Sequence, residues 1–402
     1  MLDIRIKPCY AEYQRTLSKK QNILANKEFL WRIGALINIY VYRALSKKVL
    51  FLGFCLMSKL TLEEVAKLAG VSRATVSRVV NKPERVSPKY RERVLKVIEE
   101  TGYQPNQAAR MLVSRRSNIL GLIIPSRADL IFTDPYFAAL ITGISRACNM
   151  HDYTLALFVF HSQEEQDQVY QRALGTGLLD GLIVTADKIT DPLIPQIIAR
   201  KIPAVYVGRP LDKAYTSFVD VDNVAGAYMA VSHLLRLGYQ RVATITGPMS
   251  STTSMDRYEG YTKALAERDR SIEDNLVVYG DFTRDGGYTA MRQLLPHHPD
   301  AVFVATDTMA LGAIQAIHEA NLTIPDDIAI VGFDDLSPAT IADPPLTTIR
   351  QPVNQNGMLA VETLIDLLET GPVPPRHTIL PTQLIIRATC GAMKFNNGNY
   401  VP

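Results

Sequence analysis

The chain has 402 residues, of which 47% are hydrophobic and 21% charged, a composition that excludes fibrous, collagenous and wholly disordered classes. The formal net charge is only +3, but residues 1–116 carry 23 basic and 9 acidic side chains, whereas the rest carries 20 and 31. A basic front followed by an acidic body indicates a polyanionic partner for the front.

The cysteines and the longest apolar runs exclude further classes. No C-x-x-C pair or histidine cluster is present, so we expect no metal, no cofactor and no disulfide framework, and a reducing cytoplasm fits best. The apolar runs 33–42 and 49–57 are shorter than the roughly 20 residues of a membrane helix, so we expect no membrane anchor. The second run lacks the cleavage site of a signal peptide. The cysteines are Cys9, Cys55, Cys148 and Cys390.

Residues 1–56 differ in pattern from the remainder of the chain. They share no periodicity with it, contain the only tryptophan, Trp31, and end just before Met57, where a well-patterned helical unit begins. The interpretation that we favour is that the functional protein starts at Met57, downstream of a misassigned start codon. The alternative is an additional helical arm that packs on the adjacent helical unit or on a partner.

A first short helix is predicted after Thr61. Thr61 and Glu64 have the spacing of a capping box, in which each side chain satisfies a free backbone N–H of the helix start. Apolar residues then recur at 62, 65, 66 and 69, on one helical face, and Gly70 provides the left-handed stop. A tight turn over residues 70–72 comes next.

Two further helices complete the unit. Ser72 is predicted to cap a second helix over 73–80, which turns valines inward and polar residues outward. Ser87 and Pro88 form a cap followed by proline at the first helical position, and the third helix ends at Gly102. Two short helices joined by a turn that contains glycine are typical of a helix-turn-helix.

The chemistry of this unit suits DNA. The outer face of the second helix carries Arg73 and Arg78, which can reach guanine edges in the major groove. Basic residues around it can bind phosphates. Any one of these residues could equally be an ordinary charge on a solvated helix. The unit as a whole favours DNA binding, because it combines the caps, the turn and an excess of 13 basic over 6 acidic residues across 57–116. The surrounding basic residues are Lys82, Arg85, Lys89 and Arg91.

Two segments carry a resemblance to a known family. Residues 62–81 read LEEVAKLAGVSRATVSRVVN, and residues 86–117 read VSPKYRERVLKVIEETGYQPNQAARMLVSRRS. The unit resembles the DNA-binding headpiece of the lactose-repressor/galactose-repressor (LacI) family of bacterial transcription regulators. In that family the positions of Arg73, Ala74 and Arg78 read the operator, so the resemblance implies that these three set sequence preference. With them we group, as expected DNA contacts, Thr61, Ser72, Thr75, Ser77 and Asn81.

The resemblance extends to a hinge. The family's hinge helix matches Asn106 to Leu112, with Ala109 between them, and a leucine at the position of Leu112 is wedged into the minor groove. Inserting an apolar side chain costs unstacking energy that a bent, more extensively contacted duplex offsets. A simple linker leucine is the alternative. The expected division is therefore a headpiece over 57–105, a hinge and linker over 106–117, a core over 118–392 and a tail over 393–402.

Residues 118–392 alternate short β-branched runs with helical patterns. Such alternation predicts doubly wound parallel sheets, and the length predicts two lobes divided near Asp222 and Asn223. In open parallel sheets ligands bind at the carboxyl ends of the strands. The predicted strands span residues 119–124, 153–158, 181–186, 203–208, 241–247, 301–307 and 328–335.

Polar residues stand at several of these strand ends. Arg209 follows the predicted strand 203–208, and Asp307 and Asp334, the latter with Asp335, close the predicted strands 301–307 and 328–335. Asp222 stands with Asn223 at the lobe boundary, and Arg257 opens a helix. Carboxylates and a guanidinium that converge on one cleft can grip the hydroxyls of a sugar-like ligand. Each aspartate alone is more often a helix cap, and Asp307 is the one that we expect to be purely a cap. Tyr136 and Phe137 either form a surface on which a ligand ring can stack or belong to the ordinary core of the first lobe.

The core also resembles its counterpart in the LacI family, which is similar to periplasmic sugar-binding proteins. The resemblance implies that Arg257 and Asp334 are the main effector contacts. Two departures argue against a lactose-type effector, since Thr306 stands where the lactose repressor has asparagine and Gly208 where it has aspartate. The other effector contacts that it implies are Thr253, Thr306, Gln351, Tyr136, Phe137, Arg209 and Asp222.

The function expected from these observations is that of a DNA-binding regulator. We expect a repressor in the bacterial nucleoid, whose affinity for a near-palindromic operator responds to a sugar-like effector. The final residues, CGAMKFNNGNYVP, lack the family's tetramer-forming heptads, so a homodimer is expected. A solute-binding protein without a regulatory role is the alternative. An enzyme is not expected, because no phosphate loop, metal spacing or nucleophile elbow is present.

Overall fold

The computed structural model describes residues 60–81, 83–103, 116–175, 177–185, 189–211, 213–371 and 374–392. The predictions for residues 1–56, Asn106, Ala109 and Leu112 lie outside these ranges. The chain divides into two compact units, Met1–Ala109 and Arg110–Pro402, which are described separately.

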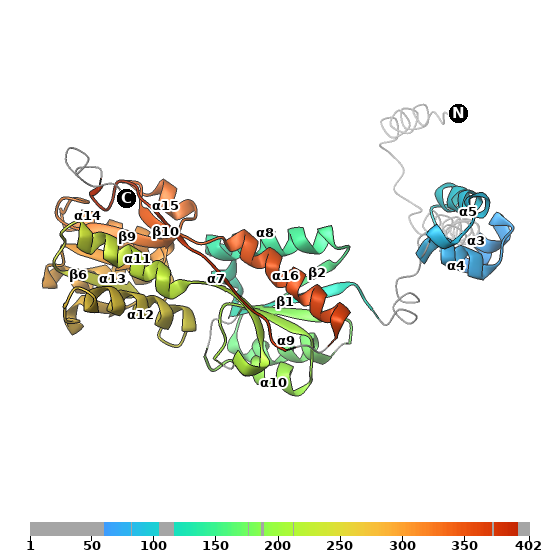
Figure 1. The fold of residues 1–402 in the computed structure, drawn as a ribbon, viewed down its shortest axis with the longest axis horizontal. Helices are drawn as coiled ribbons and strands as arrows, with labels where there is room; N and C mark the ends of the chain where they lie inside the picture. The colour runs from blue at the N-terminus through green and yellow to red at the C-terminus, as the bar shows by residue number, and fades with distance from the viewer. Residues whose placement is uncertain are drawn as a thin grey trace, which may run out of the picture. The chain divides into compact units, whose positions relative to one another are not determined.

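The described part of the N-terminal unit contains three helices around a small apolar core: α3 (Leu62–Ala69), α4 (Arg73–Asn81) and α5 (Pro88–Thr101), with a 3-10 turn, η1 (Pro83–Arg85) (Figure 1). The capping box is confirmed, because the Thr61 N–H donates to Glu64 Oε2 at 2.7 Å and the Glu64 N–H donates to Thr61 Oγ1 at 3.3 Å. Gly70 adopts the predicted left-handed conformation, with φ 63°. The core consists of Val65, Ala66, Ala69, Val76, Val79, Val94 and Tyr103.

The third helix differs from its prediction in one detail. Pro88 occupies its first turn and Gly102 ends it with φ 63°, as expected. Ser87, however, precedes the helix without any side-chain capping hydrogen bond. Proline at the first position needs no N–H partner, so the helix begins here without the serine hydroxyl.

In the second unit, the described residues form two sheets of six strands, each in its own lobe (Figure 1). The first-lobe sheet has the order β11-β5-β4-β3-β1-β2 and is parallel throughout. Its strands are β1 (Ile119–Arg127), β2 (Thr154–Phe160), β3 (Gly181–Thr185), β4 (Ala204–Val207), β5 (Ser217–Val221) and β11 (His377–Leu380).

The second-lobe sheet has the order β12-β10-β9-β8-β6-β7. It departs from the predicted all-parallel arrangement at one edge, where β12 pairs antiparallel with β10. Its strands are β6 (Val242–Thr246), β7 (Val277–Tyr279), β8 (Ala301–Val304), β9 (Ala329–Asp334), β10 (Thr347–Arg350) and β12 (Gln383–Ile385).

Helices cover the sheets in both lobes. The first lobe has α7 (Ala128–Thr133), α8 (Pro135–Met150), α9 (Gln163–Gly175), α10 (Leu193–Ala199) and α16 (Val353–Thr370). The second has α11 (Asn223–Arg236), α12 (Thr252–Ala266), α13 (Arg284–Leu294), α14 (Asp307–Glu319) and α15 (Ser337–Ile341). The 3-10 turns of this unit are η2 (Lys213–Tyr215), η3 (Asp274–Leu276) and η4 (Leu295–His297).

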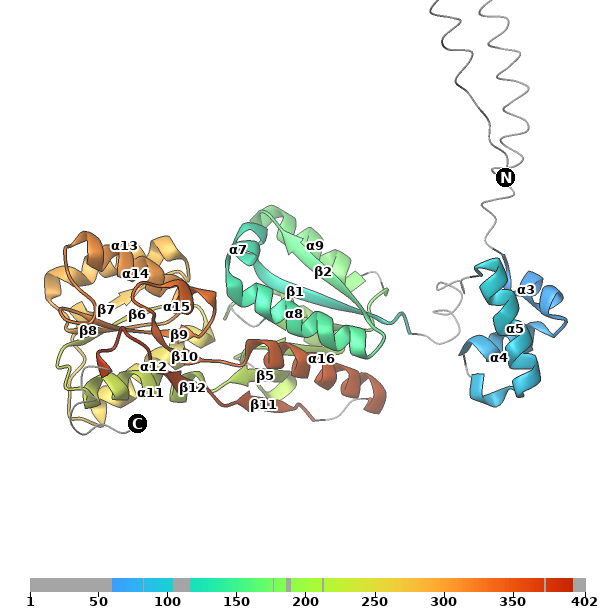
Figure 2. The same cartoon turned by 90° about the horizontal axis from the view of Figure 1, so that it is seen from above.

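The chain crosses between the lobes three times, from β5 to α11, from β10 to α16 and from β11 to β12 (Figure 2). The predicted division near Asp222 coincides with the first crossing. The later return of α16 and β11 to the first lobe has no counterpart among the predicted elements. Three connecting segments of this kind form a hinge, about which the two lobes can rotate relative to each other.

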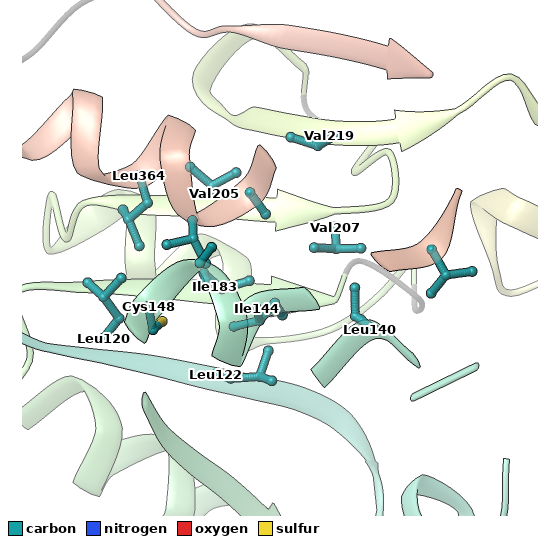
Figure 3. Packing of buried hydrophobic residues seen from close by; sticks show 14 of the residues in the cluster. Leu120, Leu122, Leu140, Ile144, Cys148, Ile183, Val205, Val207, Val219 and Leu364 are labelled. Carbon is teal, nitrogen blue, oxygen red and sulfur yellow. The ribbon is translucent and has the colours of Figure 1, made fainter. Parts of the chain in front are cut away.

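The first-lobe core is built between the sheet and the helices α8 and α16 (Figure 3). Leu122, Ile183 and Val205 of the strands are fully buried against Ile144 of α8 and Leu364 of α16. A strand with helices on both faces needs apolar side chains at consecutive positions, which is why these strands read as continuous β-branched runs.

Among the described residues, no helix is both long and apolar enough to span a bilayer.

Candidate functional site

Helix α4 presents a polar face in the N-terminal unit. Its valines Val76 and Val79 are buried against α3 and α5, which leaves Arg73, Ala74 and Arg78 exposed. These are the three residues that the resemblance assigns to base reading. The pattern of burial follows directly from the 3.6-residue helical period.

The start of α4 is fixed by Ser72. The Thr75 N–H donates to Ser72 Oγ at 3.1 Å, and the two hydroxyls lie 2.9 Å apart. Thr75 and Ser77 are half-buried, and Thr61 is exposed while it caps α3. The side chain of Asn81 lies outside the described part of the structure, so its predicted role stays a prediction.

Arg73 forms an ion pair with Glu63 of helix α3. Arg73 Nη1 lies 3.1 Å from Glu63 Oε1, and the two side chains are 72% and 55% exposed. An exposed pair of this kind contributes about 0–1 kcal/mol, so Arg73 can exchange Glu63 for a base or a phosphate at little cost. Arg85 and Lys89 are also exposed, and Arg91 is half-buried, as suits a phosphate-binding rim.

The second unit contains a cleft of about 770 Å³ between its lobes. Residues from both lobes line it, at the carboxyl ends of the strands, where ligands of open parallel sheets bind. The volume lies within the range of ligand sites, roughly 300–1,000 Å³. Of the predicted effector contacts, those that line the cleft are Tyr136, Phe137, Thr253, Arg257, Thr306, Asp334 and Gln351.

Arg257 is the buried cation of this cleft. It lies on α12, and its Nε–H donates to Asn223 Oδ1 at 2.9 Å while Nη1 donates to the carbonyl oxygen of Ala305. Its guanidinium carbon lies 3.6 Å from the ring centroid of Phe333, a cation–π contact. Burial lowers the pKa of Arg257, and the nearby charge of Asp334 opposes this effect.

Asp334 is the main partner of Arg257. Its Oδ1 lies 3.6 Å from Arg257 Nη1 and accepts a hydrogen bond of 2.5 Å from Gln351 Nε2. Burial raises the pKa of Asp334 to about 7, although the charge of Arg257 acts in the opposite direction. The residue has φ 122°, an uncommon conformation for an aspartate, and such conformations concentrate at binding sites. In either protonation state, a carboxyl oxygen of Asp334 can accept a hydrogen bond from a ligand hydroxyl.

The cap of the helix after β8 differs from its prediction. The cap of the helix after β8 is not Asp307 but Thr306, which accepts from the Met309 N–H at 3.2 Å at the start of α14. Asp307 is the first residue of the helix, where its carboxylate accepts from Thr348 Oγ1 at 2.5 Å and from the Leu336 N–H at 3.1 Å. Its pKa is raised by burial and by the charge of Asp334. Asp307 therefore braces the loop after β9.

Arg209 and Asp222 are not among the described residues that line the cleft, contrary to expectation. The Asp222 side chain caps α11, accepting from the Ala225 N–H at 2.9 Å. Arg209 binds Asp256 of the other lobe through two hydrogen bonds, of which Nε–Oδ2 measures 3.1 Å. Both side chains thus bind partners in the second lobe, and neither lines the cleft.

Asp220 lines the cleft but was not predicted as a contact, and Asn223, expected beside Asp222 at the lobe boundary, lines it too. Asp220 accepts from the Val221 N–H at 2.7 Å and from Asn223 Nδ2 at 3.2 Å. Burial raises the pKa of Asp220 to about 6. The alternation SFVDV marks β5, and recognising that strand would have placed Asp220 near its carboxyl end.

Phe282 is a further lining residue that the sequence did not reveal. Its φ of 67° is rare for an aromatic residue, and the preceding Asp281 holds the turn by accepting from Thr283 N–H at 2.9 Å and Thr283 Oγ1 at 2.7 Å. Its ring packs on Gly247, where a Cβ would lie 2.2 Å from ring carbons. The second lobe therefore offers an aromatic surface to the cleft.

The first lobe offers its own aromatic residues, Tyr136 and Phe137. Their rings are perpendicular, with centroids 5.4 Å apart, at the start of α8. Both pack against the first-lobe core, as one alternative expects, and both line the cleft, where the stacking role stays a prediction. The described residues contain no group of three His, Cys, Asp or Glu placed to hold a metal ion.

Two family models match parts of the chain. Residues 61–106 match the model for bacterial regulatory proteins of the lacI family, and residues 231–390 match a periplasmic binding protein-like domain. The chain is 37% identical to the HTH-type transcriptional regulator CelR of Thermobifida fusca, over 81% of this chain and 97% of that protein. It is 35% identical to the ribose operon repressor of Escherichia coli strain K12, over 76% and 92%.

Two solved structures are similar over most of their length. The complex of the transcriptional regulator CelR with cellobiose has a TM-score of 0.66 and 35% identity, covering 82% of this chain and 99% of that one. The lac repressor dimer bound to operator and the anti-inducer ONPF has a TM-score of 0.72 and 29% identity, covering 83% and 99%. The chain belongs to the lacI family of bacterial regulatory proteins, as a transcription regulator with a helix-turn-helix DNA-binding unit and a two-lobed core.

Proposed function

We propose that this protein is a transcription repressor of the bacterial cytoplasm that binds a near-palindromic operator as a homodimer and responds to a sugar-like effector. The observation that carries the proposal is the presence, in one chain, of an exposed basic helix α4 and of a two-lobed cleft built around Arg257 and Asp334. Effector binding changes operator affinity if the effector prefers one arrangement of the lobes, a coupling of typically 1–3 kcal/mol.

The DNA contacts of the proposal are divided by role. Arg73, Ala74 and Arg78 of α4 read base edges, while Thr61 and Ser72 and the basic rim contact phosphates. The proposed wedge into the minor groove is Leu112, with Asn106 and Ala109 in the same hinge helix. Further proposed contacts of α4 are Thr75, Ser77 and Asn81.

The lining of the cleft favours an uncharged ligand that is rich in hydroxyls. Arg257 is already engaged by Asn223, Ala305 and Asp334, and the other lining arginine, Arg284, donates to Gln315 at 3.1 Å. A phosphate or carboxylate would therefore meet no disengaged guanidinium and several carboxylates. Hydroxyl groups can donate to those carboxylates, and the faces of a sugar ring can pack on aromatic side chains. The lining carboxylates are Asp134, Asp220, Asp281, Asp285 and Asp334.

Sugars of one or two rings are the first candidates. Relatives of the chain include a CelR solved with cellobiose and a repressor named for the ribose operon. In this proposal the cleft binds its ligand without chemical change. The effector contacts in this proposal are Arg257, Asp334, Gln351, Thr253 and Thr306, together with the aromatic pair Tyr136 and Phe137.

The test combines a DNA selection with a ligand screen on the full chain. Random duplexes are selected at physiological salt, and operator affinity is then measured with cellobiose, ribose and their anionic counterparts cellobionate and ribose 5-phosphate. We expect one palindrome to be enriched and a neutral sugar, recovered unchanged, to alter its affinity. Absence of any preferred duplex contradicts the proposal. Sugar binding without DNA preference would favour the alternative, a solute-binding protein.

A further inference from the structure

Arg209 and Asp256 form an ion pair that joins the two lobes. Arg209 follows strand β4 of the first lobe, and Asp256 lies on helix α12 of the second. The contact is bidentate, since Nε and Nη2 of Arg209 donate to Oδ2 and Oδ1 of Asp256. The side chains are only 19% and 13% exposed, so solvent and salt screen the pair weakly. Asp256 is the first cause of the raised pKa of Arg209.

Two further hydrogen bonds join the lobes beside this pair. Thr252 Oγ1, at the start of α12, donates to the carbonyl oxygen of Arg209 at 2.7 Å. The backbone N–H of Ile189, after β3, donates to the carbonyl oxygen of Ser250, after β6, at 2.8 Å. All three contacts connect loops of the first lobe to the loop and helix α12 that follow β6 in the second lobe, so rotation that separates the lobes at this edge has to break them together.

The pair also stands next to the cleft. Gly208 and Arg257, the chain neighbours of Arg209 and Asp256, both line it. We propose that Arg209 and Asp256 are positioning residues that latch the lobes together at the wall of the cleft and so set how closed the core is before any effector binds. Only the effect of this latch on effector affinity rests on the proposed function. A lobe arrangement that is populated more often binds its ligand with higher apparent affinity.

The test needs neither effector nor DNA, so its failure is distinguishable from failure of the proposed function. Hydrogen–deuterium exchange of the full chain reports on closure through the Ile189 amide, whose bond to Ser250 crosses between the lobes. The Leu182 amide, which donates to Pro203 at 2.9 Å inside the first lobe, reports on the lobe's own fold. The variants are Arg209→Gln, Asp256→Asn and the charge exchange R209D/D256R.

A matched control is Arg241→Gln. It removes an ion pair of 3.0 Å with Glu273 that lies within the second lobe, with both side chains 41% exposed. Because hydrogen bonds to charged groups are stronger than neutral ones, we expect Ile189 to exchange about tenfold faster in either single variant, which corresponds to about 1.4 kcal/mol. The exchanged pair should restore slow exchange at least in part, and the control should leave it unchanged.

Three results overturn the proposal. Unchanged exchange at Ile189 in both single variants would show that the pair does not hold the lobes. An equal acceleration at Leu182 would show that the pair supports the fold of the first lobe and not its closure. Exchange in R209D/D256R as fast as in the single variants would show that the attraction between the two charges is not what closes this edge.

Discussion

At the scale of single residues, the buried carboxyl of Asp334 makes stability depend on pH. Its pKa of about 7 lies above the ordinary 3.8 because of burial, so the folded chain holds a proton that the unfolded chain releases. The free energy of unfolding therefore falls as pH rises from about 4 to about 7, and Asp220, with a pKa of about 6, acts in the same direction.

Asp334→Asn removes the titrating group and keeps an acceptor for Gln351. In the parent, the free energy of unfolding should fall between about pH 4.5 and 7.5. In the variant we expect this fall to be smaller by on the order of 2 kcal/mol, even if its stability at each pH differs from that of the parent. Urea unfolding of the full chain at both pH values measures this difference. Equal differences in the variant and the parent would contradict the protonated state of Asp334.

The residues of the cleft show what a sequence can and cannot reveal. Arg257 and Asp334 were predicted from motifs and from strand ends, and the structure brings them to 3.6 Å. Arg209 stands at a strand end as well, but its partner Asp256 belongs to the other lobe, and no local pattern encodes that pairing. Phe282 has a left-handed backbone conformation, which cannot be predicted from an aromatic residue because aromatic residues rarely adopt it.

At the scale of elements, the start of helix α3 depends on Thr61. Its hydroxyl accepts from the Glu64 N–H, so Thr61→Ala should destabilise the first turn by about 1 kcal/mol. Ser87→Ala is the matched control, since Ser87 precedes α5 without a side-chain capping bond and its loss should be nearly neutral. Amide exchange in α3 and α5 measures both effects. Equal effects of the two variants would contradict the capping assignment.

Helix α4 should separate base reading from phosphate binding. Arg73→Ala should relax preference at one base pair of the selected operator and cost about 1–3 kcal/mol, because a guanidinium can contact a guanine edge with two hydrogen bonds. Lys89→Ala should weaken all duplexes alike and reduce the salt slope of binding by about 1. Salt-titrated binding to the operator and to a scrambled duplex distinguishes them. Identical profiles for both variants would contradict the assignment of α4 to the major groove.

The close crossing of α8 and α16 depends on Gly143. A Cβ at this position would lie 2.1 Å from the carbonyl oxygen of Asn354, a backbone atom that cannot turn aside. Gly143→Ala should therefore cost about 2 kcal/mol or more, whereas Gly175→Ala at the end of α9, where no atom lies within 4 Å, should not destabilise. Thermal unfolding of both variants checks this, and equal midpoints would contradict the close contact.

Each of the seven predicted apolar runs forms a strand, and six of these strands lie inside their sheets, whereas β2 is a partly buried edge strand. The strands that were not predicted include the edge strands β7, β11 and β12 and the strand β10, which lack a long apolar run. The return of α16 to the first lobe was not predictable either. An apolar helical face specifies burial but not which of two sheets it covers.

At the scale of the whole molecule, the two functions of the chain have to be coupled in both directions. If a neutral sugar changes operator affinity by some factor, the operator must change the affinity for that sugar by the same factor, because both paths connect the same four states. We expect a factor of about 5–150, the usual range for such coupling. A latch such as Arg209 and Asp256 shifts the lobe equilibrium, so its variants should alter the measured affinities but leave the two factors equal to each other. Calorimetric titration of the sugar with and without saturating operator, beside operator titrations with and without the sugar, measures both factors. Unequal factors would mean that additional linked equilibria, such as dissociation of the dimer, take part in the response. If both factors equal one, filling the cleft has no influence on the DNA-binding unit.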